Sequence, residues 1–324
     1  MKKKEVLSKI QELLKSGQKE NIEIACIQAE AQNISKDEVL NPWLEIIDDN
    51  ELIASPLLNI FSKLFSQNSL WLNGLKKIPQ NIIFLRNLKN LDLAYNEIST
   101  LPTNIGELLN LETMNLSGNN LSTIPEGLRF PKKLKTIKLS GNNLSTIPDG
   151  IGLLKKLEII DLCKNKFKSI PESIKNLKSL SDLDLSLNYI NCIPNFIGDL
   201  QNLTRLDLEE NAISILPISI SKLQKLDYLN LEENKIEVIP ESIYELKNLT
   251  CLLLGQNNIK SLSEKIGNLA KIELLGLESN QLNQIPKSIS KLKNLKELYI
   301  KDNMLSIREV QKIEKLVPWC KVIT

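Results

Sequence analysis

Five cysteines are the side chains in this sequence most suited to nucleophilic chemistry, and Cys163 is the strongest candidate among them. Lys164 follows it directly, and a neighbouring cation lowers the pKa of a thiol. The sequence contains no histidine, so the base that most often activates a cysteine nucleophile is missing. We therefore interpret Cys163, which we expect to be exposed, as a structural residue. We predict no catalytic residues and keep a cysteine-dependent enzyme only as the least favoured alternative.

The spacing of the cysteines argues against both a metal site and a disulfide framework. No two of them form a Cys-x-x-Cys motif, and an odd number without a pairing pattern fits a reducing compartment. The sequence also lacks a glycine-rich phosphate loop and a zinc signature. We therefore expect no metal and no cofactor.

Acidic side chains are the second group that could do chemistry, and they recur in short runs such as Asp182-Leu183-Asp184. Paired carboxylates support acid–base catalysis when a closed pocket shifts their pKa values and excludes water. Here they alternate with leucine, which is typical of the exposed face of a strand. An open strand surface argues against shifted pKa values, so we expect these carboxylates to bind a partner rather than to catalyse.

The elements that position these side chains repeat along the chain, and asparagine marks the period. Eleven asparagines follow one another at intervals of 23 residues, a register that chance does not produce. They are Asn73, Asn96, Asn119, Asn142, Asn165, Asn188, Asn211, Asn234, Asn257, Asn280 and Asn303. The chain is therefore a stack of small, similar units.

Each unit carries the same arrangement of apolar residues around its asparagine. Leu91 and Leu93 lie two residues apart, so in a strand they share one face and point inward. Pro102 and its equivalents stop that strand from continuing because proline lacks an N–H group. A full unit reads Leu88-x-x-Leu91-x-Leu93-x-x-Asn96-x-Ile98-x-x-Leu101-Pro102, and further units begin at Leu111, Leu134, Leu157, Leu180, Leu203, Leu226, Leu249, Ile272 and Leu295.

This pattern resembles the leucine-rich repeat family, whose consensus is LxxLxLxxNxLxxLP. It is most similar to the 23-residue intracellular type of Ras-linked scaffolds, their plant relatives and many bacterial proteins. The resemblance covers residues 65–324, with few departures such as Ser263 in place of proline. It implies an α/β solenoid, a curved horseshoe whose concave side is a parallel sheet. It also implies that the asparagine amides bridge backbone groups of adjacent units.

The two ends of such a stack need caps, because each unit buries only one side of itself. Residues 1–64 lack the repeat and carry apolar residues at helical spacing, as in Lys4–Lys15. Ser35 can cap a further helix, and Pro56 begins the last helical segment. We predict a helical cap over residues 1–64, with a separate binding module as the alternative. Residues 65–324 form about eleven units, the last of them a C-terminal cap.

The outward side chains of the strands and of the residues just after them form the concave surface, which we call the strand face. Its middle units are acidic, and equivalent residues on neighbouring strands lie about 5 Å apart, so Asp184 and Asp207 are like-charge neighbours. Such pairs favour a basic partner, although solvated acidic residues that balance lysines elsewhere would give the same pattern. The residues assigned to the partner are Asp182, Asp184, Asp207, Glu209, Glu210, Glu232 and Glu233.

Apolar residues follow the acidic ones along the strand face, and they are Tyr228, Leu253, Leu274 and Tyr299. An apolar strip beside an acidic one fits an interface with an anchor region and a steering region. The alternative is that curvature already shields these side chains. At the other end, Trp71, Leu72 and Tyr95 form a second candidate anchor, or else they pack beneath the N-terminal helices.

Charge and hydropathy narrow the class of partner. A net charge of +2, with lysines that do not interleave with aromatic residues, argues against nucleic acid. No apolar stretch is long enough to span a membrane, and an amphipathic segment stands where a signal peptide would be apolar. We expect a cytoplasmic scaffold that binds a protein partner with a basic surface. The alternative, suggested by the resemblance, is a bacterial effector-like protein that modulates a signalling enzyme or a small GTPase pathway. The oligomeric state, the partner's identity and secretion without a signal stay open.

Overall fold

The computed structural model describes residues 3–43 and 57–324, and the chain divides into two compact units, residues 1–136 and 137–324. Pro56, which we expected to begin a helix, lies outside the described residues. Within the described part of the chain, no helix is long and apolar enough to cross a membrane.

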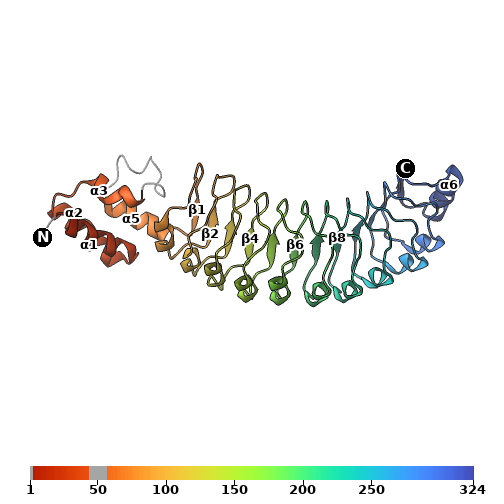
Figure 1. The fold of residues 1–324 in the computed structure, drawn as a ribbon, viewed down its shortest axis with the longest axis horizontal. Helices are drawn as coiled ribbons and strands as arrows, with labels where there is room; N and C mark the ends of the chain where they lie inside the picture. The colour runs from red at the N-terminus through yellow and green to blue at the C-terminus, as the bar shows by residue number, and fades with distance from the viewer. Residues whose placement is uncertain (1–2, 44–56) are drawn as a thin grey trace. The chain divides into compact units, whose positions relative to one another are not determined.

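Helices occupy the N-terminal part of the first unit, as the apolar spacing predicts (Figure 1, red to orange). Ser35 caps one of them through the expected hydrogen bond, because its hydroxyl oxygen accepts the N–H of Glu38 at 3.3 Å. The carboxylate of Glu38 in turn accepts the N–H of Ser35. The described helices are α1 (Lys3–Lys15), α2 (Lys19–Ala31), α3 (Lys36–Leu40), the short 3-10 helix η1 (Asn41–Trp43) and α5 (Leu57–Ser66).

An aromatic cluster joins these helices to the first repeat. Trp43 is fully buried, and its ring lies edge-on to Phe61 and Phe65 of α5, at centroid distances of 5.7 and 5.2 Å. The ring of Phe84, which belongs to the repeat region, lies 6.2 Å away on another side of Trp43. The amide of Asn87 donates to the carbonyl oxygen of Phe65 at 2.8 Å. The apolar end of the first repeat is therefore covered by helix side chains.

Short parallel strands recur once per repeat, each pairing with the next in sequence within its unit. In the first unit Leu91 stands opposite Leu70 and Met114, and in the second Leu183 stands opposite Ile160 and Leu206. The strands are β1 (Ser69–Trp71), β2 (Asn90–Asp92), β3 (Thr113–Asn115), β4 (Thr136–Lys138), β5 (Ile159–Asp161), β6 (Asp182–Asp184), β7 (Arg205–Asp207), β8 (Tyr228–Asn230), β9 (Cys251–Leu253), β10 (Leu274–Gly276), β11 (Glu297–Tyr299) and β12 (Lys321–Ile323). The repeat period therefore sets the strand register.

A short 3-10 helix returns the chain after each of the strands β1 to β10. In the repeat of β4, the N–H of Ile151 donates to the carbonyl of Pro148 at 3.1 Å, and the N–H of Leu154 donates to the carbonyl of Ile151 at 2.9 Å. Proline starts most of these helices because its own N–H is not needed there. They are η2 (Gln80–Phe84), η3 (Ile105–Glu107), η4 (Glu126–Arg129), η5 (Asp149–Leu153), η6 (Glu172–Asn176), η7 (Asn195–Asp199), η8 (Ile218–Lys222), η9 (Glu241–Glu245), η10 (Glu264–Asn268) and η11 (Lys287–Lys291).

The repeated asparagines link adjacent turns of the backbone. The amide of Asn165 donates to the carbonyl of Leu139 in the preceding repeat at 2.9 Å and to that of Leu162 in its own repeat at 3.1 Å. Its oxygen accepts the N–H of Leu144 at 3.0 Å. The same bonds recur at Asn188, Asn234 and later repeats, and most of these side chains are buried. This ladder satisfies backbone groups that no strand partner reaches.

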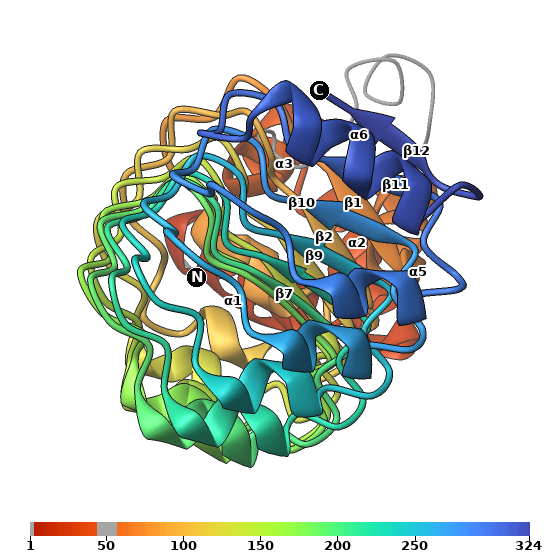
Figure 2. The ribbon, with the colours of Figure 1, turned by 90° about the vertical axis from the view of Figure 1, so that its right-hand side faces the viewer.

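The second unit ends in helix α6 (Ile307–Leu316) and strand β12, which pairs with β11. Figures 1 and 2 both place α6, in blue, at the C-terminal end of the stacked repeats of this unit. Ser306 accepts the N–H of Glu309 at 3.2 Å and so begins the helix. Each unit thus has the parallel, unclosed repeat architecture that the sequence predicts.

Candidate functional site

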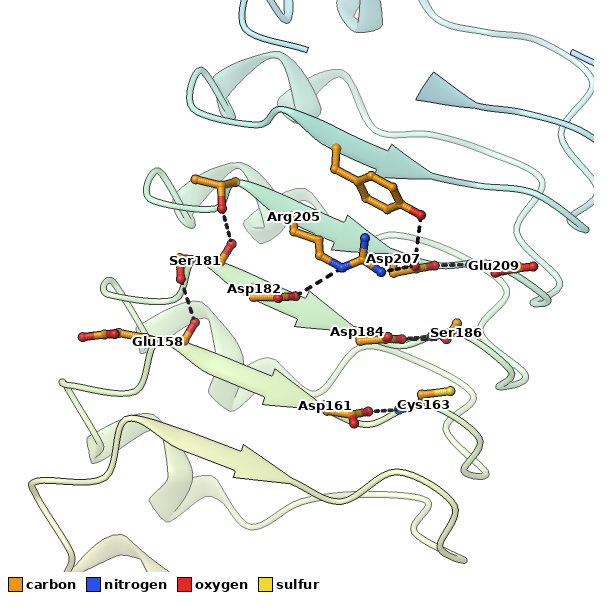
Figure 3. Close-up of polar contacts among 12 residues, drawn as sticks. Glu158, Asp161, Cys163, Ser181, Asp182, Asp184, Ser186, Arg205, Asp207 and Glu209 are labelled. Atoms are coloured by element: carbon orange, nitrogen blue, oxygen red, sulfur yellow. Dashed lines mark hydrogen bonds and ion pairs between the residues drawn. The ribbon is translucent and has the colours of Figure 1, made fainter. Parts of the chain in front are cut away.

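The acidic part of the strand face is built by β6 and β7 and by the residues that follow them. Asp182 and Asp184 lie on β6, opposite Arg205 and Asp207 of β7 (Figure 3). The like-charge pair expected from the sequence, Asp184 beside Asp207, is therefore present in the register of the strands. Glu209 and Glu232 follow β7 and β8 by two residues each and are half-buried.

Arg205 lies among these carboxylates, which we call the acidic row (Asp182, Asp184, Asp207, Glu209 and Glu232). Sequence reasoning missed this arginine. Its Nη2 lies 2.6 Å from Oδ2 of Asp207, and its Nε lies 3.7 Å from Oδ1 of Asp182. Its guanidinium also stacks 4.0 Å from the centroid of the Tyr228 ring. Arg205 occupies the same repeat position as Asp182 and Tyr228, 23 residues from each. A search of that repeat position for basic residues would therefore have found it.

The aspartates at the strand ends also hold the turns that follow. One carboxylate oxygen of each accepts the N–H two residues later: Asp161 from Cys163 at 3.0 Å, and Asp184 from Ser186 at 3.0 Å. Asp207 does the same for Glu209 at 3.2 Å. One oxygen of each aspartate therefore stabilises the turn, and the other oxygen is available for contacts on the strand face.

Carboxylate pKa values on this face are shifted, contrary to the expectation drawn from an open strand surface. Burial, reinforced by Asp184, raises the pKa of Asp207 above its usual range. Burial also raises the pKa of Asp161 and of Asp182, the latter against the opposing effect of Arg205. Burial, Glu278 and Glu209 together raise the pKa of Glu232 to about 7. Negative charge is thus crowded on this face, and Arg205 relieves only part of it.

Glycines explain why Glu232 meets Glu278, a second residue that sequence reasoning missed. Gly255 stands between them in the repeat, and a side-chain carbon there would lie 2.8 Å from the carboxyl carbon of Glu278. A carbon on Gly276 would lie 3.2 Å from an oxygen of Glu278 and 3.4 Å from one of Glu232. The two glycines therefore leave the space into which both carboxylates turn.

The apolar strip lies on β8 to β11, next to the acidic row. Tyr228, Leu253, Leu274 and Tyr299 are all half-buried. The hydroxyl of Tyr299 donates to the carboxylate of Glu297 at 2.7 Å, which leaves its ring on the strand face. Partial shielding thus coexists with an available apolar surface.

Two of the predicted acidic residues occupy a different place. Glu210 and Glu233 have left-handed backbone, each with a φ of 52°, and they line a groove beside the strand face. Glu209 and Glu232, their immediate predecessors, stay with the acidic row. The seven acidic residues are therefore divided between two surfaces.

In the first unit, the candidate anchor is exposed. Trp71 is 68% exposed and Tyr95 is 85% exposed, so the alternative in which these two residues pack beneath the N-terminal helices is wrong. Leu72 is half-buried. The Tyr95 ring lies over Gly118 of the next repeat, where a side-chain carbon would come within 2.7 Å of it.

Cys163 is not the exposed, activated thiol that its neighbour Lys164 suggested. The side chain is half-buried, and burial raises the thiol pKa, while Asp184 and Asp161 add to that effect and a hydrogen bond with Ser186 opposes it. A thiol in this setting is a poor nucleophile at neutral pH. Its surroundings therefore fit the structural interpretation.

Comparison with known proteins decides the family. Sequence models of the leucine-rich repeat match residues 87–108, 110–130, 132–190, 155–213 and 193–236. A leucine-rich repeat protein of Leptospira interrogans is 38% identical, with a TM-score of 0.80 over 81% of this chain and 67% of that one. The chain belongs to the leucine-rich repeat family. Its assignment to the 23-residue intracellular type stays a prediction.

Other leucine-rich repeat structures are more distant. The Arabidopsis receptor kinase HAESA, solved with a peptide hormone and a co-receptor, is 32% identical, with a TM-score of 0.64 over 74% of this chain and 43% of that one. An internalin of Listeria monocytogenes shares the fold at 22% identity, with a TM-score of 0.55 over 81% of this chain and 87% of that one. No curated protein sequence matches this leucine-rich repeat chain significantly.

Proposed function

We propose that the strand face of the second unit binds a basic segment of a protein partner and does no catalysis. The observation that carries the proposal is the crowding of carboxylates around Arg205, Glu232 and Glu278. Several of these groups have raised pKa values because burial and like charges disfavour their ionised form. A lysine or arginine from a partner would relieve that repulsion. The repulsion between carboxylates in the isolated protein therefore favours binding of a basic partner.

The apolar strip supplies the other half of such an interface. Charged groups steer the encounter and select the partner, whereas buried aromatic and aliphatic side chains hold the complex. Tyr228 belongs to both parts, because its ring packs on Arg205 and its hydroxyl points to Asp207 at 3.5 Å. The acidic row and the apolar strip therefore form one continuous surface over β6 to β11.

Relatives of known structure support a binding role. HAESA was solved with a peptide hormone and a co-receptor, so this fold carries protein and peptide recognition in at least that relative. An effector-like protein that acts on a signalling enzyme or a small GTPase pathway would use the same strand face and would differ only in the identity of its partner. The five free thiols support a reducing compartment such as the cytoplasm.

We also propose that residues 1–64 cap the first repeat. The contacts of Trp43, Phe65 and Asn87 support this, since they cover the apolar end of that repeat with helix side chains. A cap of this kind keeps a stack of repeats from associating end to end.

The test is a pull-down from cell lysate with chemical crosslinking, at low and at high salt, with three baits. The first is the unchanged protein. The second carries Asp161→Asn, Asp184→Asn and Glu232→Gln, which remove the ionisable groups, while the two asparagines keep the oxygen that accepts the N–H of the following turn. The third removes three exposed charges away from the strand face, through Asp199→Asn, Glu237→Gln and Glu245→Gln.

A partner of the strand face is retained by the first and third baits, is lost from the second, and is released by high salt because screening weakens ion pairs between surfaces. Crosslinks from that partner should fall on residues of β6 to β11. Equal recovery by all three baits would contradict the assignment of this face.

A further inference from the structure

A second surface of this unit has the features of a binding groove. It has a volume of about 470 Å³ and runs across consecutive repeats beside the strand face. Its sides are formed by Lys164, Lys166, Leu187, Tyr189, Glu210 and Glu233, and ladder asparagines from Asn142 to Asn211 also line it. The residues come from five successive repeats, so the groove runs across the direction of the strands.

The ladder asparagines contribute little polar recognition of their own. The Asn188 amide already donates to three carbonyl oxygens, those of Leu162, Leu185 and Ser186, and its oxygen accepts the N–H of Phe167. These groups are satisfied within the protein. Selectivity in the groove must therefore come from the side chains along its sides.

One side chain from each repeat that forms the sides of the groove stands where the backbone alone would favour glycine. Lys164 and Leu187 have a φ of 53°, whereas Gly118 and Gly141 fill the same repeat position with φ of 65° and 63°. Left-handed backbone costs a residue with a side chain on the order of 1 kcal/mol. The turn is held by backbone bonds, such as Leu187 N–H to the carbonyl of Glu209 at 2.9 Å, which need no side chain. Stability of the repeat therefore does not require these side chains, and side chains also stand at this repeat position outside the groove, as at Gln256 and Ser279.

Charge along the groove is ordered. Lys164 and Lys166 make one end cationic, and Glu210 and Glu233 make the other end anionic. Leu187, which is 40% exposed, and Tyr189, which is 62% exposed, lie in the repeat between them. Adjacent strands are about 4.8 Å apart, so the charged ends are separated by about 10 to 14 Å. An extended chain covers that distance in three or four residues.

We propose that this groove binds an extended peptide segment that carries an acidic and a basic residue three or four positions apart, with apolar residues between them. The acidic side chain pairs with Lys164 and Lys166, the apolar residues lie on Leu187 and Tyr189, and the basic side chain pairs with Glu210 and Glu233. This site differs from the strand face in the peptide that it selects, because the strand face takes a basic segment.

The experiment is selection of a displayed library of random linear peptides on the full-length protein and on three variants. Leu187→Gly removes the apolar side chain and also relieves the left-handed backbone, so its melting temperature should be unchanged or higher. A fourfold variant, Lys164→Glu, Lys166→Glu, Glu210→Lys and Glu233→Lys, reverses the polarity at constant net charge. The third variant is the strand-face triple described above.

We expect the unchanged protein to select peptides with the acid–apolar–base spacing in one preferred order along the chain. A synthetic peptide of the selected sequence should bind Leu187→Gly about tenfold more weakly, the effect of roughly 1.4 kcal/mol of lost apolar burial. The charge-reversed variant should select the opposite order, and the strand-face triple should select the original peptides.

Three results would overturn the proposal: no enrichment, enrichment that survives both groove variants, or enrichment of uniformly basic peptides that only the strand-face triple loses. The last of these would support the strand face while removing the groove. If the pull-down finds no partner of the strand face but the groove peptides are still selected, the strand-face proposal fails and the groove proposal stands. The two proposals can therefore be refuted separately.

Discussion

The carboxylates of Glu232 and Glu278 converge over Gly276, with oxygens 3.4 and 3.2 Å from the point that a Cβ on this glycine would occupy. The two residues are 46 positions apart, two full repeats, and the intervening repeat contributes Gly255. Glycine at both positions thus brings together two acidic groups that a side chain would separate.

Stability should depend on pH through Glu232. Its pKa rises from the ordinary value near 4.5 to about 7 on folding, so its favourable contribution is complete below about pH 4.5 and is lost as pH rises through 7. Glu232→Gln should therefore be more stable than the unchanged protein at pH 8, on the order of 1 kcal/mol because water screens a half-exposed group, and similar to it at pH 5. Urea unfolding at both pH values measures this. The exposed control Glu245→Gln should differ by less than about 0.5 kcal/mol at either pH, and an equal gain at pH 5 would refute the assignment.

Removing Arg205 should leave Asp207 as a buried, unpaired carboxylate. Asp207 is only 5% exposed, so Arg205→Met should cost about 2 kcal/mol of unfolding free energy at pH 7. The cost should shrink toward pH 4 as Asp207 becomes protonated, because a group with a raised pKa is better tolerated in its neutral form. The double variant Arg205→Met with Asp207→Asn should recover most of the loss.

The matched control for that series is Lys222→Met, which removes an exposed cation of η8 and should change stability by less than about 0.5 kcal/mol. Equal destabilisation by Arg205→Met at pH 4 and pH 7 would mean that packing on Tyr228, rather than charge, is what Arg205 provides.

The ladder should be sensitive to loss of a single amide. Asn188→Ala leaves the buried N–H of Phe167 without its acceptor and removes one of the two amide donors to the carbonyl of Leu162, the other being Asn165, at a cost of about 1 to 3 kcal/mol. The change should appear as a lower melting temperature followed by circular dichroism. Asn191→Ala, at an exposed position three residues later, should have almost no effect, and a comparable loss there would argue against a special role for the ladder.

Alkylation should separate the cysteines by their surroundings. Cys192 is exposed, whereas burial raises the pKa of the half-buried Cys163 thiol and raises the pKa of Cys251 and Cys320 to about 11. A short pulse of iodoacetamide at pH 7.5 should therefore label Cys192 first, as read by peptide mass spectrometry. Labelling of Cys163 as fast as Cys192 would restore it as a candidate nucleophile.

The repeat made much of this fold predictable. Asn96 and its equivalents recur at a constant interval, and in a stack of similar units each repeat contacts mainly its neighbours, so one period predicts strand positions and register together. For the same reason the period alone places Asp184 opposite Asp207, as the strand register confirms. The helix that begins after Ser35 was predictable because its cap is local in sequence.

The sequence by itself therefore determined the family, the parallel repeats and which residues of each strand point outward, because these depend on periodicity and on local backbone chemistry. Only the tertiary structure decided how those side chains pair. Arg205 reaches Asp182 and Asp207 on two strands, Glu232 reaches across a whole repeat to Glu278, and Tyr95 stays exposed rather than packing beneath the helices. Such contacts depend on side-chain conformation and on the space left by neighbours, which a repeat consensus does not encode.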